Sequence, residues 1–578
     1  MNKTIIAGAI IAAGAVGGYV AFQGMSGSES GGSVPALKTS NVLEYIPSST
    51  PFLYAQIEPV STMAMLEQYK NNAVAEELGQ EVLDTLRNEF ASEGPGAQFV
   101  VELLSPFYTN LNNPEQILAT TGLADAASYY AYTLGMVPVL KFGIADETAF
   151  WQYIDAAQTN SGVTHTVKTL EGVEYRDYPI VDPSEDEKYL STIVAVKDGV
   201  ATITFDTNLF ETTLPIALEV EKPAESLAST GTLEALEKTY PLAKSGVGYL
   251  DFQKIVAALT NPTGSLLGEQ LNSIAAEDRG MQSMLENTSV GACQTELDAI
   301  AANWPRLVMS YDIDQEARTQ QFNMTMESNN QVILNALKSL QGELPAFLDN
   351  NEMLASFGIG LNAGNIGTAV TDIVNELQTP SFECFPLAAG QSELSSINGD
   401  LAGIHMVTPF VTGVKGFSTG VFGVDVAGDA PSVDGLIVLT AEDPLGVVRM
   451  TKGFVGEIAI LEESANGNVI NLSDSFPTAM FTPAPVYAVT HGNHLAIYQG
   501  DKASKAAAKL ADGETSNDLI KADVNFGAIM DIVMAEAEKY ASPDELEMIK
   551  ALSNNDVTLD YNLNISAQGI TIDGTSTY

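Results

Sequence analysis

Histidine, cysteine, tryptophan and basic residues are all scarce in this sequence. Its 578 residues include 4 His, 2 Cys and 2 Trp. Neither a Walker motif, an EF-hand loop nor a dinucleotide-binding fingerprint occurs. The two cysteines are not spaced as zinc ligands. We therefore expect no metal ion, no cofactor and no motif-defined catalytic residue.

Acidic residues greatly outnumber basic ones. The chain has 26 Lys and Arg against 73 Asp and Glu, a formal net charge of −47. Such a surface repels nucleic-acid phosphates and anionic lipid headgroups, so neither is an expected partner. The excess of acid could suit cations or basic partners, although solubility or adaptation to a salty medium is the simpler explanation.

Charge is absent from Thr4–Phe22, the run that follows Lys3. At about 1.5 Å per residue this run roughly spans the hydrocarbon core of a bilayer. Because positive charge stays on the cytoplasmic side, residues 1–22 predict a signal anchor. The bulk of the chain would then lie in the periplasm of a bacterium, held by one pass through the inner membrane. The alternative is secretion after signal-peptide cleavage. Residues 23–40, with a Gly/Ser-rich core, predict a flexible linker.

Cys293 and Cys384 are predicted to form a disulfide, because an exported chain meets an oxidising medium. Closing a loop of about ninety residues would stabilise the fold by roughly 4 kcal/mol in the chain-entropy model. Two independent buried thiols are the alternative, since sequence alone does not bring two Cα atoms within bonding distance.

Two hairpins organise the rest of the chain. Tyr189–Asp206 has Asp198-Gly199 between two β-rich runs, and Pro485–Gln499 repeats the pattern around His491-Gly492-Asn493. Helix-like runs follow them, at Asn208–Val220 and Asp501–Asp512 respectively.

Further elements recur in the same order around the hairpins. A strand-to-helix unit, Ser245–Leu259, matches Asp518–Ala535, and an alternating hairpin, Arg306–Glu327, matches Val557–Asp573. We therefore predict an α+β fold of two pseudo-repeated units, residues 41–345 with helical insertions and residues 346–578. Each unit is expected to have its own antiparallel sheet, covered by helices on one face.

Two patterns suggest chemistry, and each has a simpler explanation. Gly416–Gly420 matches the G-x-S-x-G elbow of serine hydrolases, with Ser418 as nucleophile, but the residues after it predict a strand where the elbow needs a helix. His491 and His494 form an H-x-x-H pair, but they lie at a hairpin turn, and the matching turn at Asp198-Gly199 has no histidine.

The organisation resembles that of uncharacterised bacterial envelope proteins with a membrane anchor and a large extracytoplasmic region. Met1–Phe22 carries the resemblance, together with Tyr45–Pro59, where a Pro-containing turn precedes a strand. The resemblance brings no catalytic residues with it, and we expect a non-enzymatic binding or structural protein. A protein partner or an apolar ligand would bind in a cleft between the two halves. A serine hydrolase that uses Ser418 is the alternative.

Overall fold

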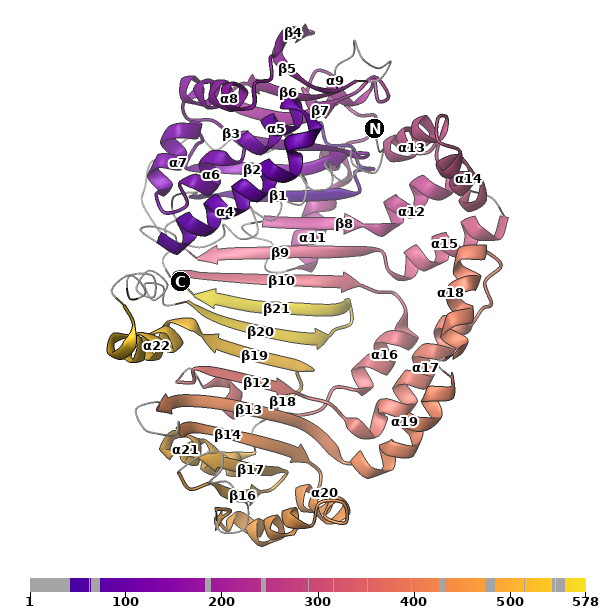
Figure 1. Ribbon diagram of the computed structural model, residues 1–578. Coiled ribbons are helices and arrows are strands. Elements are labelled where there is room, and N and C mark those ends of the chain that lie inside the picture. The colour runs from indigo at the N-terminus through magenta and orange to yellow at the C-terminus, as the bar shows by residue number, and fades with distance from the viewer. Residues whose placement is uncertain are drawn as a thin grey trace. The chain divides into compact units, whose positions relative to one another are not determined.

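The computed structural model describes residues 42–577, apart from residues 62, 64–72, 182–188, 241–245, 290, 315–316, 351, 397, 426–431, 474–483, 514, 543–545 and 547–556. The predicted anchor at residues 1–22 and the linker at 23–40 lie outside the described residues. The protein belongs to the predicted α+β class, with an antiparallel sheet of 19 strands (Figure 1). The expectation of a separate sheet for each hairpin is wrong, because strand pairing connects both hairpins into this one sheet.

The chain divides into two compact units, which we call unit 1 (up to Met324) and unit 2 (Thr325–Thr577). Strand β10 (Thr319–Glu327) carries the boundary. The other strands of unit 1 are β1 (Phe52–Ser61), β2 (Ala126–Leu134), β3 (Val137–Gly143), β4 (Thr166–Leu170), β5 (Val173–Val181), β6 (Leu190–Lys197), β7 (Val200–Asp206), β8 (Gly246–Asp251) and β9 (Arg306–Asp314). They pair in the order β4-β5-β6-β7-β3-β2-β1-β8-β9-β10.

Helices cover both faces of the unit 1 strands. Phe99 and Phe150, from α5 (Pro95–Glu102) and α8 (Glu147–Ser161), pack with Val194 of β6 on one face. Leu236 of α11 (Thr232–Thr239) packs with Tyr249 of β8 on the other. The remaining α-helices are α4 (Ala73–Phe90), α6 (Ser105–Thr109), α7 (Pro114–Thr121), α9 (Thr213–Ala217), α10 (Leu227–Thr230), α12 (Phe252–Thr260), α13 (Leu266–Ala275), α14 (Arg279–Thr288) and α15 (Gly291–Asn303).

Unit 2 places nine further strands in the large sheet: β12 (Ala355–Ile359), β13 (Val414–Asp425), β14 (Ser432–Ala441), β15 (Ile470–Asn471), β16 (Tyr487–His491), β17 (His494–Gln499), β19 (Ile520–Asn525), β20 (Thr558–Ile565) and β21 (Gly569–Thr577). They pair in the order β15-β16-β17-β14-β13-β12-β19-β20-β21. Two short strands, β11 (Leu344–Pro345) and β18 (Thr515–Ser516), pair with each other.

The helices of unit 2 also pack on both faces of its strands. Ala503 and Ala507 of α21 (Asp501–Lys509) contact Val438 on one face. Val448 of α20 (Pro444–Thr451) and the 3-10 segment η5 (Gly456–Gly467) pack with Leu495 on the other. The remaining α-helices are α16 (Gln331–Ser339), α17 (Ile366–Gln378), α18 (Phe385–Ser396), α19 (Asn398–Val411) and α22 (Phe526–Tyr540).

The nine strands of unit 2 follow the order of β5-β6-β7-β3-β2-β1-β8-β9-β10 in unit 1. Backbone hydrogen bonds recur at corresponding strand ends. The N–H of Asp251 donates to the carbonyl of Pro51, and that of Asn525 donates to the carbonyl of Leu354. Likewise Ile144 donates to Gly199, and Ala441 donates to Asn493. These bonds and the strand registers fix which residues of the two units are equivalent.

Both organising hairpins form where the sequence predicts them. Lys197 pairs with Val200 across Asp198-Gly199, where both turn residues have positive φ (52° and 79°), and His491 pairs with His494 across the second turn. The helix predicted at Asn208–Val220 is shorter, because only Thr213–Ala217 is α-helical. Pro215 has no N–H to donate and fits only a first helical turn, and Glu219, at φ 58°, turns the chain out of the helix.

Candidate functional site

Ser418 lies in the middle of β13, paired with Gly358 on one side and Val438 on the other. It is completely buried, and its hydroxyl has no hydrogen-bond partner among the described residues. A nucleophile elbow instead presents its serine on a sharp turn between a strand and a helix. The geometric basis of the hydrolase alternative is therefore missing at this position.

His491 and His494 face each other as the last pair of the second hairpin. His494 is buried, and its Nδ1 lies 3.1 Å from Oγ1 of Thr440. Burial lowers the pKa of His494, and the nearby His491 lowers it further. Within the described part of the chain, no group of three or more His, Cys, Asp or Glu residues is arranged to hold a metal ion.

The disulfide between Cys293 and Cys384 is present, as the sequence predicts. Cys293 lies in the first turn of α15, and the buried Cys384 immediately precedes α18. A disulfide of this kind suits an extracytoplasmic domain, because the cytoplasm keeps thiols reduced. Among the described residues, no helix has both the length and the apolar character needed to cross a bilayer.

One face of the unit 2 sheet is apolar over six adjacent strands, β14-β13-β12-β19-β20-β21. The registers align its residues in three rows: Gly435, Val421, Ala355, Val524, Leu559 and Ser576; Ile437, Thr419, Phe357, Ala522, Tyr561 and Gly574; and Leu439, Phe417, Ile359, Ile520, Leu563 and Ile572. We call these residues the apolar face. No row contains a charged residue, whereas the alternating positions on the opposite face include Lys521, Asp523 and Asp560.

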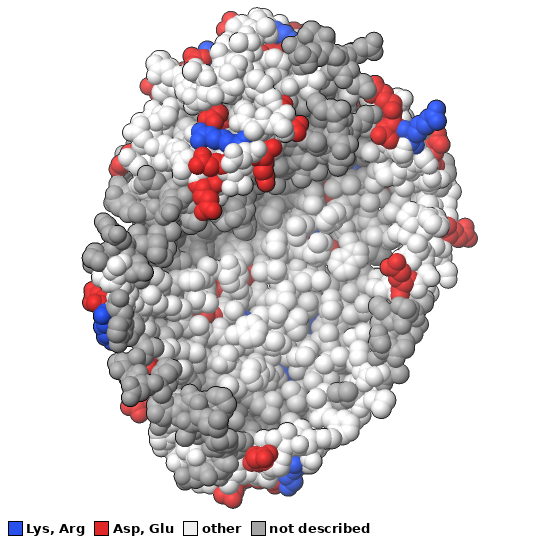
Figure 2. Space-filling view, in the orientation of Figure 1, with Lys and Arg blue, Asp and Glu red and all other residues white. Residues whose placement is uncertain are grey.

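The apolar face exposes large side chains. Phe357 is 39% exposed, Phe417 46%, Ile437 47% and Tyr561 43%. In Figure 2, which has the orientation of Figure 1, few red or blue atoms lie over these strands. Because apolar side chains are normally withdrawn from water, a contiguous exposed group of this kind is a candidate binding surface.

The equivalent face of unit 1 is closed. Tyr54, which corresponds to Phe357, is only 9% exposed, and its ring stacks on that of Tyr311 at a centroid distance of 5.7 Å. The rings lie close to glycines of β8, where a Cβ added at Gly246 would be 2.3 Å from the Tyr311 ring. The open face is therefore a property of unit 2.

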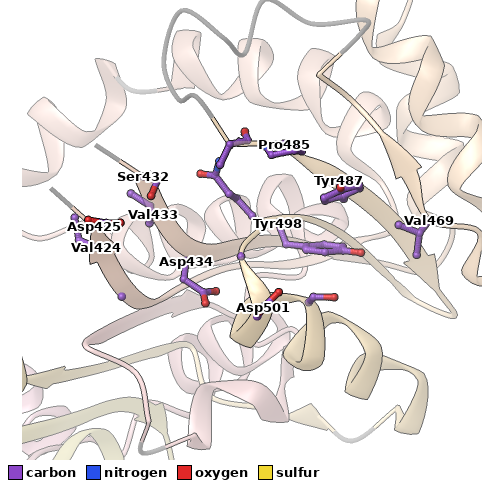
Figure 3. A pocket seen from close by; sticks show the side chains of 15 residues that line it. Val424, Asp425, Ser432, Val433, Asp434, Val469, Pro485, Tyr487, Tyr498 and Asp501 are labelled. Carbon is purple, nitrogen blue, oxygen red and sulfur yellow. The ribbon is translucent and has the colours of Figure 1, made fainter. Parts of the chain in front are cut away.

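Unit 2 also contains a pocket of about 770 Å³ near the start of α21 (Figure 3). Tyr487 and Tyr498 line it with rings 5.9 Å apart, and Asp425, Asp434 and Asp501 contribute carboxylates. The Asp434 carboxylate accepts hydrogen bonds from the backbone N–H groups of Lys502 (3.0 Å) and Ala503 (2.8 Å). Burial raises the pKa of the Tyr498 phenol, so this ring remains neutral at neutral pH.

Sequence reasoning anticipated neither the apolar face nor the pocket. Alternating residues in β12, β13 and β20 do indicate that one side of each strand is apolar. The strand order, however, decides which of these residues lie side by side. The order becomes apparent only when β12 is placed between β13 and β19. Comparison with protein-family models, with curated proteins and with solved structures finds no match to this chain.

Proposed function

We propose that this chain is a membrane-anchored extracytoplasmic protein that binds an uncharged acyl chain on the apolar face of unit 2. The observation that carries the proposal is the register of three uncharged rows across six strands. A non-enzymatic binding role accords with this surface.

The size of the face favours a small ligand over a stable protein partner. Six strands about 4.8 Å apart and five residues of about 3.4 Å each give a flat area of roughly 400–500 Å². A standard protein interface uses about 800 Å² from each partner. The only side-chain hydroxyls in the three rows belong to Thr419, Tyr561 and Ser576, so the face offers contact with hydrocarbon and few hydrogen bonds.

We further infer that the two units arose by duplication and that the open face is a specialisation of the second. The shared strand order and the recurring strand-end hydrogen bonds support this inference. We therefore place the proposed ligand on unit 2 alone. The apolar face takes the place of the cleft between the two halves that we expected from the sequence.

A direct binding assay tests the proposal. Full chain held in peptidiscs, without free detergent, is titrated with a pyrene-labelled monoacylglycerol. The double substitution Phe357→Ser with Tyr561→Ser should weaken binding at least tenfold, because each lost aromatic contact is worth about 1.5 kcal/mol or more. Phe454→Ser is the matched control, since Phe454 is 78% exposed but outside the apolar face. Equal affinity of the wild type and the double variant would contradict the proposal.

We place the described region in the bacterial periplasm, attached through residues 1–22. The disulfide supports an oxidising compartment, and the uncharged run after Lys3 supports an anchor. Alkaline phosphatase fused after Tyr578 should be active in membrane fractions, because this reporter needs an oxidising compartment. Activity recovered only in the culture medium would instead support the cleaved, secreted alternative.

A further inference from the structure

The pocket of unit 2 occupies a place that is filled with side chains in unit 1. By strand register Asp434 corresponds to Val137, and Gln499 corresponds to Phe205. Counting back from the two hairpin turns, Ala484 corresponds to Leu190. Val137, Leu190 and Phe205 are buried together in one hydrophobic cluster of unit 1. At these three described positions unit 2 therefore lacks the large apolar side chains that fill the space in unit 1.

The replacements leave a cavity with a defined chemistry. Its volume, about 770 Å³, lies within the range of roughly 300–1,000 Å³ typical of small-molecule sites. Of the described residues that line it, three are Asp and none is Lys or Arg. Figure 3 shows Asp434 and Asp501 on one side of Tyr498, with Tyr487 on the opposite side.

The hydrogen bonds at the start of α21 decide which sign of charge the pocket favours. A free helix N-terminus attracts anions through its backbone N–H groups. Here the N–H groups of Lys502 and Ala503 already donate to Asp434. The carboxylate of Asp501, which also lines the pocket, favours a cation, and the tyrosine faces can contact a cationic group and its apolar substituents.

We propose that this pocket binds a small organic ammonium ion that carries an apolar or aromatic group. The site is separate from the apolar face and does not depend on the acyl-chain proposal. Asp501 provides charge, Tyr487 and Tyr498 provide the aromatic wall, and Gln499 closes one side through its hydrogen bond to the carbonyl of Ala484 (2.8 Å).

The test is isothermal titration of the full chain in a nonionic detergent with benzyltrimethylammonium, at about 0.15 M salt to screen general attraction by the acidic chain. We expect saturable binding at one site. Benzoate, which has the same ring and the opposite charge, should not bind. Absence of saturable binding by the ammonium ion, or equal binding of benzoate, would overturn the proposal.

Two independent variants locate the site. Asp501→Asn should weaken binding at least fivefold, and Gln499→Phe with Ala484→Leu, which restores the residues of unit 1, should weaken it at least tenfold. Asp512→Asn removes the same charge from an exposed position outside the pocket and should change affinity less than twofold. If Asp512→Asn weakens binding as much as Asp501→Asn does, the ion is held by general charge and the proposed site is wrong.

Discussion

Lys141 is a charged residue in the interior of unit 1, at a position where unit 2 has Val438. Its Nζ forms an ion pair with Glu219 at 2.8 Å and donates to Oγ1 of Thr202 (3.0 Å) and the carbonyl of Ala217 (2.9 Å). These contacts hold the end of α9 against the sheet. Because a buried ion pair offsets its own desolvation cost only when it is complete, the pair should be sensitive to loss of one partner.

Lys141→Met should destabilise unit 1 by about 2–4 kcal/mol, because it leaves Glu219 without its cation. Adding Glu219→Gln should recover part of this loss. Urea unfolding followed by tryptophan fluorescence measures unit 1 alone, since Trp151 and Trp304 are the only tryptophans and both belong to it. A Lys141→Met variant as stable as the wild type would show that the ion pair contributes little.

The pH dependence of the same residue has a definite sign. Burial lowers the pKa of Lys141, although Glu219 opposes the shift. Between the folded pKa and the unfolded value of 10.5, the unfolded chain therefore binds more protons. The contribution of Lys141 to stability should increase as pH rises through this window. The stability difference between the wild type and Lys141→Met should accordingly widen at alkaline pH.

At the scale of elements, equivalent aspartates begin equivalent helices. Asp146 accepts hydrogen bonds from the N–H groups of Thr148 and Ala149 at the start of α8, and Asp443 accepts one from Gly446 at the start of α20. Each lies four residues after an equivalent strand position, Phe142 in β3 and Leu439 in β14. The cap is thus part of the motif that the two units share.

Asp146→Ala and Asp443→Ala should each cost about 1 kcal/mol, because the first-turn N–H groups lose their acceptor. Urea unfolding followed by tryptophan fluorescence should show the loss of stability in Asp146→Ala. Hydrogen exchange of α20 should show the loss of stability in Asp443→Ala. Asparagine at either position keeps an acceptor and is the control. Because an exposed ion pair is worth little, Asp443→Asn should remain near wild type despite losing the pair with Arg449. If the alanine variants are as stable as the asparagine variants, the capping role is wrong.

The sequence predicted the two organising hairpins because turn residues and alternation are local signals. The hairpin at Tyr189–Asp206 is marked by Asp198-Gly199, and its turn forms at these two residues. The pocket was not predictable in this way. Asp434, Tyr487 and Asp501 come from separate segments, and their meeting depends on strand order. Comparison of Gln499 with Phe205 could have indicated the missing apolar residues, once the hairpins were aligned.

At the scale of the whole molecule, the two units share a strand order but differ in what their surfaces expose. Tyr54 and Tyr311 close one face of unit 1, whereas Phe357 and Phe417 leave the equivalent face of unit 2 open. A net charge of −47 repels anionic headgroups. On these grounds an uncharged acyl chain is the ligand that we propose.

The most direct test of the apolar face is photo-crosslinking in the native envelope. Cells are fed a photoactivatable fatty acid that enters their neutral lipids, and the crosslinked peptides of this protein are identified by mass spectrometry. Our account predicts crosslinks in β12, β13 and β20, with loss of these crosslinks in the Phe357→Ser, Tyr561→Ser variant. Crosslinks confined to residues 1–22, with none in unit 2, would contradict it.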